Sequence, residues 1–198
     1  MSRKEVFAVA QMGPVHLADS KQATVARLIE MLREAHARRA RWVTFPELAL
    51  TTFFPRYVYD DPAEYDRFYE EGLPSPAMVP LFEAAKELGV GFYLGYAEKV
   101  TEGGEVHRFN TSVLVGPDGK ILGKYRKIHL PGTRDPIGDP EFEHLEKRYF
   151  EVGNLGFPSF ATPSGRFGMC ICNDRRWPET FRTMALRGAE GFLLGYNT

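Results

Sequence analysis

The chain has 198 residues, of which 43% are hydrophobic and 26% are charged, and its 25 Lys and Arg residues nearly balance its 26 Asp and Glu residues. This composition is typical of a globular protein and excludes a disordered chain or a long coiled coil. The net charge of −1 gives no electrostatic reason to expect nucleic acid or an anionic membrane as the main partner. No apolar run approaches the roughly 18 residues of a membrane span, and the N-terminal run is too short for a signal peptide. We therefore expect a cytoplasmic protein.

The first segments predict a β-α-β unit. An apolar run over residues 5–11 predicts a strand that is buried on both faces. Asp19 or Ser20 can cap the helix that follows, in which apolar residues recur at helical spacing opposite charged ones. A second, short strand is expected over residues 42–45.

The middle of the chain predicts a helix and then a group of strands. A Pro-rich, aromatic loop over residues 53–74 ends at Ser75 and Pro76, which favour a helix start, and Gly89 favours the end of that helix. Turn sequences separate the strands that follow, which are expected over residues 90–97, 110–115 and 120–124.

The last third of the chain begins with a long charged loop over residues 131–148. This loop is polar enough to lie at the surface and long enough to be functional. After it we expect two paired strands, a helix and a final strand, over residues 157–162, 166–171, 178–187 and 191–196.

This order of elements favours a layered α/β or α+β fold over a purely doubly wound one. No repeat or linker divides the chain, so residues 1–198 are expected to form a single domain. The apolar strand at 191–196 has no helix behind it, although a buried strand needs a layer on each face. We therefore expect these residues to be the N-terminal portion of a longer fold, or to need a partner surface.

Three reactive side chains each follow a predicted strand: Glu47, Lys127 and Cys172. Strand ends hold side chains rigidly in a pocket, so the shared position matters more than any one residue. Taken singly, the three are typical of a solvated carboxylate, a solvated basic residue and a small buried hydrophobic residue. A zinc site is disfavoured, because the spacing of the candidate ligands Cys170, Cys172, His129 and His144 fits no usual zinc site.

Together the three side chains form a complete set for acyl transfer. A Cys thiol with an ordinary pKa of about 8.5 is mostly protonated at neutral pH and needs a base, which Glu47 could supply. The positive charge of Lys127 could stabilise the oxyanion that forms when Cys172 attacks a carbonyl carbon. This chemistry needs no metal and no cofactor.

Three segments resemble the signature segments of the nitrilase superfamily of C–N hydrolases. In the family's order they are FPEL, KYRKIHL and GMCICND, at residues 45–48, 124–130 and 168–174. The resemblance implies an α-β-β-α sandwich and a Glu-Lys-Cys triad, with Glu47 as general base, Lys127 as oxyanion stabiliser and Cys172 as nucleophile. It also implies a homo-oligomer, either a dimer or a tetramer.

The segment after the cysteine indicates one branch of this superfamily. Two adjacent arginines are costly to bury unless they meet anions, and one could bind a substrate carboxylate as a bidentate fork. Alternatively, either arginine pairs with Asp174 or Glu179. Together with residues 144–146 and 196–198, this segment is similar to N-carbamoyl-D-amino acid hydrolases. That similarity implies a small N-carbamoyl amino acid bound by His144, Glu146, Asn173, Arg175, Arg176, Asn197 and Thr198, with Glu146 orienting either Lys127 or the substrate.

The reaction expected from this resemblance is hydrolysis of N-carbamoyl-D-amino acids to the D-amino acid, ammonia and carbon dioxide. The preference for the D form comes from the resemblance alone. Three alternatives stay open: a related amidase or N-carbamoyl-β-alanine hydrolase, an inactive fragment that acts only through association, and a metal-binding module. Among the side chains near the motifs, His129 is expected to be a hydrogen-bonded structural histidine and Trp177 a core residue.

Overall fold

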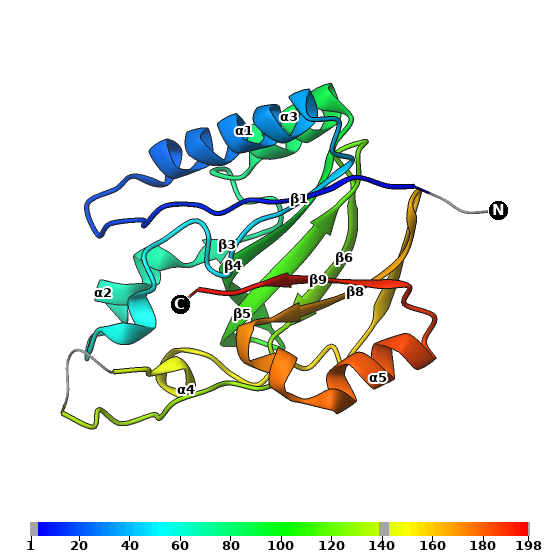
Figure 1. Ribbon diagram of the computed structural model, residues 1–198. Coiled ribbons are helices and arrows are strands. Elements are labelled where there is room, and N and C mark those ends of the chain that lie inside the picture. The colour runs from blue at the N-terminus through cyan, green and yellow to red at the C-terminus, as the bar shows by residue number, and fades with distance from the viewer. Residues whose placement is uncertain (1–3, 139–142, 198) are drawn as a thin grey trace.

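Two β-sheets pack face to face, with helices on their outer sides (Figure 1). The computed structural model describes residues 4–138 and 143–197. The larger sheet has the strand order β1 (Phe7–Val9), β2 (Trp42–Thr44), β4 (Gly91–Glu102), β5 (Glu105–Val115) and β6 (Ile121–Arg126), and β3 (Glu70–Glu71) pairs with β4. The smaller sheet has the order β7 (Ser159–Thr162), β8 (Gly165–Ile171) and β9 (Gly191–Gly195).

Both sheets combine parallel and antiparallel pairs. Strands β1, β2 and β4 are parallel neighbours, whereas β4, β5 and β6 form an antiparallel meander. In the smaller sheet β7 and β8 are antiparallel, and β8 and β9 are parallel. Parallel neighbours need a crossover connection, which α1 (Lys21–Ala37), α3 (Val79–Leu88) and α5 (Pro178–Leu186) provide.

The helices complete an α-β-β-α order of layers, as expected. Helices α1 and α3 lie on one side of the two sheets, and α5 lies on the other (Figure 1). Ser20 caps α1 by accepting the Ala23 N–H at 3.1 Å, and Gly89 ends α3 with a φ of 65°. Two short helices, α2 (Pro62–Tyr65) and α4 (Glu146–Tyr149), lie in the long loops. None of the helices in the described residues combines the length and the apolar character needed to cross a membrane.

Buried side chains fill the spaces between these layers. One cluster, which includes Leu28 and Phe92, lies between the helices α1 and α3 and the larger sheet. A second cluster lies between the two sheets, where the Trp42 indole donates to the Ser164 hydroxyl at 2.8 Å. A third, aromatic cluster surrounds Phe54. Burial of this apolar surface is the main stabilising contribution to the fold.

The first strand is shorter and more exposed than its apolar sequence predicts. Val9 on β1 exposes 84% of its surface, so the prediction of a strand buried on both faces is wrong. The reason is topology, because β1 lies at the edge of the larger sheet, beyond β2. Strand β9 is likewise an edge of the smaller sheet, and Phe192 on it is 37% exposed. An apolar run does not say whether a strand is central or at an edge.

Other differences concern the loops and the element boundaries. Helix α3 begins at Val79, later than expected, and the Ser75 hydroxyl donates to Glu70 at 2.5 Å instead of capping a helix. Strand β5 begins at residue 105, earlier than expected. The loop over residues 131–148 ends in α4, where Leu145 and Glu146 are fully buried, so a surface position is wrong for these residues.

Candidate active site

Glu47 lies just beyond β2, in a segment of the chain that runs alongside β4. The Ala49 N–H donates to the Gly95 carbonyl at 2.9 Å, which ties the backbone around Glu47 to the larger sheet. Glycine is needed at position 95 because a Cβ there would lie 2.7 Å from the Glu47 Cα. Leu48 has a φ of 49°, in the left-handed region that few residues other than glycine adopt. The Glu47 carboxylate is thereby held inside the protein, fully buried.

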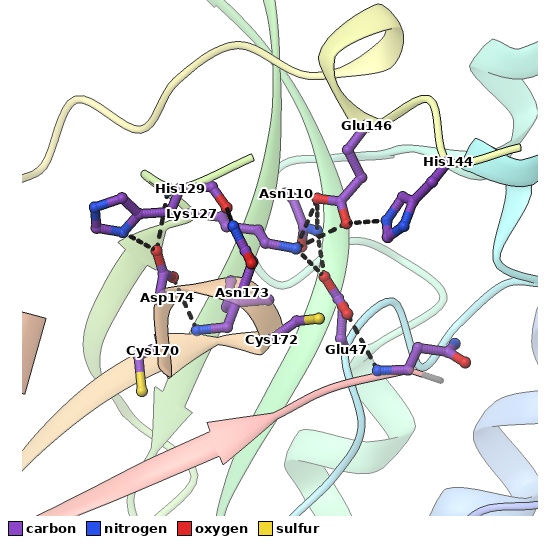
Figure 2. A network of polar contacts seen from close by, with 12 residues as sticks. Glu47, Asn110, Lys127, His129, His144, Glu146, Cys170, Cys172, Asn173 and Asp174 are labelled. Atoms are coloured by element: carbon purple, nitrogen blue, oxygen red, sulfur yellow. Dashed lines mark hydrogen bonds and ion pairs between the residues drawn. The ribbon is translucent and has the colours of Figure 1, made fainter. Parts of the chain in front are cut away.

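Lys127 follows β6 and lies between two carboxylates (Figure 2). Its Nζ is 2.6 Å from Glu47 Oε1 and 2.8 and 2.7 Å from the two oxygens of Glu146. All three side chains are fully buried, so a single ammonium neutralises two carboxylates in a site of low dielectric. His144 Nε2 extends the network, at 3.0 Å from Glu146 Oε1. Of the two contacts expected for Glu146, this geometry fits the one with Lys127.

Cys172 begins a turn directly after β8. Its φ of 44° is a strained conformation for a residue with a Cβ. Asp174 holds this turn, because its Oδ2 accepts the Ile171 N–H at 3.0 Å and the Tyr125 hydroxyl of β6 at 2.9 Å. The turn is thus tied to the strand that precedes Lys127. The Cys172 side chain points toward the Glu47 carboxylate (Figure 2).

Arg175 lies beside the cysteine in the same turn. Its Nη1 donates to the Cys172 carbonyl at 2.8 Å and is 3.7 Å from the sulfur. Its guanidinium lies 5.2 Å from the ring centre of Tyr196, at the end of β9. The remaining guanidinium N–H groups have no hydrogen-bond partner among the described residues. A positive group with unused donors therefore lies next to the thiol.

One member of this polar network was not predicted from the sequence. Asn110 on β5 is fully buried, and its Nδ2 donates to Glu47 Oε1 at 2.8 Å and to Glu146 Oε2 at 3.3 Å. Its backbone carbonyl accepts the Lys127 N–H at 2.8 Å. A signal was present in the sequence, because three polar residues at 110–112 interrupt an apolar strand, and buried polar groups need partners.

The two carboxylates have opposite pKa shifts. Burial raises the pKa of Glu47; attraction to Lys127 opposes this shift without cancelling it, and repulsion from Glu146 adds to it. Burial also acts to raise the pKa of Glu146, but the hydrogen bond from His144 and the charge of Lys127 outweigh it, so that pKa lies below its usual value. Glu47 is therefore the stronger base of the two.

Lys127 and Cys172 are both protonated at neutral pH. Burial acts to lower the pKa of Lys127, but the charges of Glu47 and Glu146 outweigh it and raise that pKa. Burial, with a smaller contribution from the charge of Glu47, raises the pKa of the Cys172 thiol to about 11. Such a thiol needs a base before it can act as a nucleophile.

The structure brings together four of the residues expected to bind substrate, three through their side chains and one through its backbone. His144 and Glu146 belong to the polar network, and Arg175 lies beside the cysteine. Asn197 contributes its backbone, because its N–H donates to Glu47 Oε2 at 3.1 Å. These contacts come from α4 and the loop before it, the turn after β8 and the end of β9.

Two other expected residues, Asn173 and Arg176, do not join this group. Asn173 Nδ2 donates to the backbone carbonyl of His129 at 3.1 Å, so its amide is already engaged. Arg176 is exposed, and within the described part of the chain neither arginine pairs with Asp174 or Glu179. Successive residues of a 3₁₀ turn such as Cys172–Arg176 point about 120° apart, so they cannot all face one pocket. Thr198 lies outside the described residues.

His129 and Trp177 stack beside this turn. His129 Nδ1 is 2.8 Å from Asp174 Oδ1, which fits the expected hydrogen-bonded structural histidine. Trp177 stacks on His129 at 4.8 Å but is 46% exposed, so its expected place in the core is wrong. Among the described residues, no group of three His, Cys, Asp or Glu side chains is arranged to hold a metal ion.

A cavity of about 950 Å³ opens next to Glu47. The segment after β1 forms one wall, and Tyr196 and Asn197 at the end of β9 form another. Phe53 and Tyr57 lie on the side of the long aromatic loop. A cavity of this size can hold a small organic molecule.

Comparison with known proteins identifies the family. Residues 7–196 match the model of the carbon-nitrogen hydrolase family, so the chain belongs to that family. This confirms the resemblance to the nitrilase superfamily and the fold class expected from it.

Particular relatives can be named from sequence and from structure. The chain is 34% identical to N-carbamoylputrescine amidase from Arabidopsis thaliana, over 91% of this chain and 55% of that protein. It is 34% identical to a nitrilase from Pyrococcus abyssi, over 92% of this chain and 61% of that protein. A carbon-nitrogen hydrolase from Helicobacter pylori G27 has a similar structure, with a TM-score of 0.73 and 26% identity over 96% of this chain and 59% of that one. The chain thus spans a little over half the length of these relatives.

Proposed function

We propose that this protein hydrolyses C–N bonds of small N-carbamoyl compounds through a covalent intermediate on Cys172. In this proposal Glu47 is the general base and Lys127 stabilises the oxyanion. The supporting observation is that three distant strand ends converge. Lys127 Nζ contacts Glu47 at 2.6 Å, and the Cys172 side chain points toward the same carboxylate (Figure 2).

The first half-reaction forms the acyl-enzyme. Glu47 takes the thiol proton, the sulfur bonds to the carbamoyl carbon, and the carbonyl electron pair moves onto the oxygen. Lys127 Nζ contacts one oxygen of Glu47 and both oxygens of Glu146, so one of its two contacts with Glu146 must give way for an ammonium N–H to reach this oxyanion. When the carbonyl forms again, the C–N bond breaks and the departing nitrogen takes the proton from Glu47.

The second half-reaction releases the product. Water bonds to the acyl carbon while Glu47 takes a proton from it, and the C–S bond then breaks and the sulfur recovers that proton. Whichever nitrogen leaves first, water releases a carbamic acid, and the remaining C–N bond breaks as this acid loses carbon dioxide. The products are therefore the free amino acid, ammonia and carbon dioxide. The raised pKa of Glu47 suits both half-reactions, because it makes the carboxylate a stronger base toward the thiol and toward water.

We further propose that the substrate carries a carboxylate, as an N-carbamoyl-D-amino acid does. Arg175 offers a positive charge next to Cys172, with donors that can bind a carboxylate bidentately. The same charge would repel a cationic substrate such as N-carbamoylputrescine, which the name of the Arabidopsis relative specifies. The preference for the D form is supported by the sequence resemblance in residues 144–146, 173–179 and 196–198.

Ammonia release from a panel of substrates tests this function. The panel is N-carbamoyl-D-phenylalanine, its L enantiomer, N-carbamoyl-β-alanine and N-carbamoylputrescine. We expect release from the D compound and no release with the Cys172→Ala variant. Faster release from N-carbamoylputrescine would favour the activity named for the Arabidopsis relative instead. Release from no compound would contradict the proposal and favour an inactive fragment.

The two adjacent arginines give a matched pair of variants for the carboxylate site. Arg175→Met should raise KM for N-carbamoyl-D-phenylalanine about 10- to 100-fold, because a charge-assisted hydrogen bond contributes about 1.5–3 kcal/mol. Arg176→Met should change KM little, because Arg176 is exposed. Steady-state kinetics of the two variants decide the point, and equal effects would contradict the role of Arg175.

A further inference from the structure

We propose that Asn110 is a positioning residue that holds Glu47 and Glu146 in place around Lys127 and sets the pH range in which Glu47 acts as a base. This inference rests on the proposed function, in which Glu47 deprotonates Cys172. It concerns a residue of β5, between the strands β4 and β6.

The amide group of Asn110 matches the two carboxylates one for one. An amide nitrogen carries two N–H groups, and Asn110 Nδ2 directs them to Glu47 Oε1 at 2.8 Å and to Glu146 Oε2 at 3.3 Å. Two buried carboxylates that share one cation repel each other, which favours protonation of one of them. A neutral donor between them reduces that repulsion without adding a charge. Lys127 and Asn110 therefore bridge the same two carboxylates.

The backbone of Asn110 fixes the third member of the group. Its carbonyl accepts the Lys127 N–H at 2.8 Å, directly beyond the last paired residues of β5 and β6. Asn110 thus holds the backbone of Lys127 through its carbonyl and the carboxylates of both partners of Lys127 through its side chain. This backbone contact stays intact when the side chain of residue 110 is changed.

The environment of the Asn110 side-chain oxygen indicates that the site uses the N–H donors of this amide. Asn110 Oδ1 is buried and has no hydrogen-bond partner among the described residues. An unsatisfied buried acceptor is destabilising, so an apolar side chain would serve packing better. The donor end cannot be exchanged with the acceptor end, because Oδ1 would then face two carboxylates.

Several other groups act on Glu47 from the surrounding elements. The charged or titratable ones are Lys127 after β6, Glu146 on α4, Cys172 after β8 and Tyr93 on β4. The Asn197 N–H after β9 donates to the second oxygen of Glu47. Among these side chains and that of Asn110, only the asparagine can be removed without changing a charge or removing an ionisable group.

The experiment measures the rate of Cys172 alkylation by iodoacetamide as a function of pH, with mass spectrometry to separate it from Cys170. In the wild type the rate should rise through the pKa of Glu47 and then level off, well below the titration of the thiol itself. In Asn110→Ala this rise should move up by about one pH unit, because a hydrogen bond to a carboxylate stabilises its charged form. Asn110→Ser keeps one donor and should shift the rise less.

Thr111→Val is the matched control. Thr111 is the next residue of β5 and is also fully buried, but its hydroxyl donates to Glu98, at 2.8 Å, outside the site. Its pH profile should equal that of the wild type. An unshifted profile in both Asn110 variants, or an equal shift in Thr111→Val, would overturn the inference. A wild-type profile without any rise below the thiol titration would instead contradict Glu47 as the base, and with it the proposed function.

Discussion

Glu98 and Glu47 are both buried carboxylates held by residues of β5 and β6, but their partners differ. Glu98, on β4, accepts hydrogen bonds from Arg126 Nε at 2.8 Å, from Lys124 Nζ at 2.5 Å and from the Thr111 hydroxyl at 2.8 Å. Burial acts to raise its pKa, but Arg126 and Lys124 outweigh burial, so the pKa of Glu98 lies below its usual value.

The partners of Glu47 come from the residues next to those of Glu98. Lys127 follows Arg126, and Asn110 precedes Thr111. Successive side chains of a strand point to opposite faces, so neighbouring residues of β5 and β6 serve two separate networks. In the network of Glu47 a single cation is shared by two carboxylates, and the pKa of Glu47 is raised.

The comparison shows that the ratio of cations to carboxylates decides what a buried carboxylate can do. Glu98 has two cations and remains ionised over the whole physiological range, so it can only hold strands together. Glu47 shares one cation and its pKa is raised, so it takes up a proton more readily than Glu98 does. Two buried glutamates, Glu98 on β4 and Glu47 just beyond β2, thus have opposite pKa shifts although they are the same type of residue.

Neutralising each cation in turn should separate the two networks. Lys127→Met should lower the rate of N-carbamoyl-D-phenylalanine hydrolysis about 10²- to 10³-fold, as loss of an oxyanion donor does. Arg126→Met should instead destabilise the fold by about 3–5 kcal/mol, because it leaves a buried carboxylate with less compensation. Turnover per folded molecule and urea unfolding measure these two effects. A full rate in Lys127→Met would contradict the role of Lys127.

The sequence predicted the positions of residues that follow strands better than those within turns. The contact between Glu47 and Lys127 follows from where the strands β2 and β6 of one sheet end, which depends on the sheet and not on side-chain detail. The direction of Asn173 and Arg176 depends on how the strained turn after Cys172 is wound, and no periodicity reports that. The catalytic roles, the single domain, the cytoplasmic location and the homo-oligomer stay predictions.

Tertiary contacts also explain the burial of the two residues whose exposure the sequence pattern predicted least well. Glu146 lies in a charged loop, yet it is fully buried because Lys127, Asn110 and His144 donate to it. Val9 lies in an apolar run, yet it is exposed because β1 is an edge strand. In both cases the exposure of the side chain depends on elements distant in sequence, and a local sequence pattern carries no information about them.

The two glutamates should respond to pH in opposite directions when each is made permanently neutral. The folded-state pKa of Glu98 is lowered, so this group contributes stability above its unfolded pKa and loses it as pH falls through the folded pKa. The folded-state pKa of Glu47 is raised, so its contribution is complete below the unfolded pKa and is lost as pH rises through the folded pKa. The sign of the pH dependence therefore differs between the two sites.

Thermal unfolding of Glu98→Gln and Glu47→Gln between pH 4 and pH 8 measures this difference. At pH 8 we expect Glu98→Gln to be less stable than the wild type by about 2 kcal/mol, or roughly 4–8 °C in Tm, and this deficit should shrink toward pH 4. The Tm of Glu47→Gln relative to the wild type should instead increase by a few degrees from pH 4 to pH 8, while its activity is lost. Comparing slopes cancels any pH-independent change in packing or hydrogen bonding caused by the amide. Slopes of the same sign would mean that the cation-to-carboxylate ratio does not control these two sites.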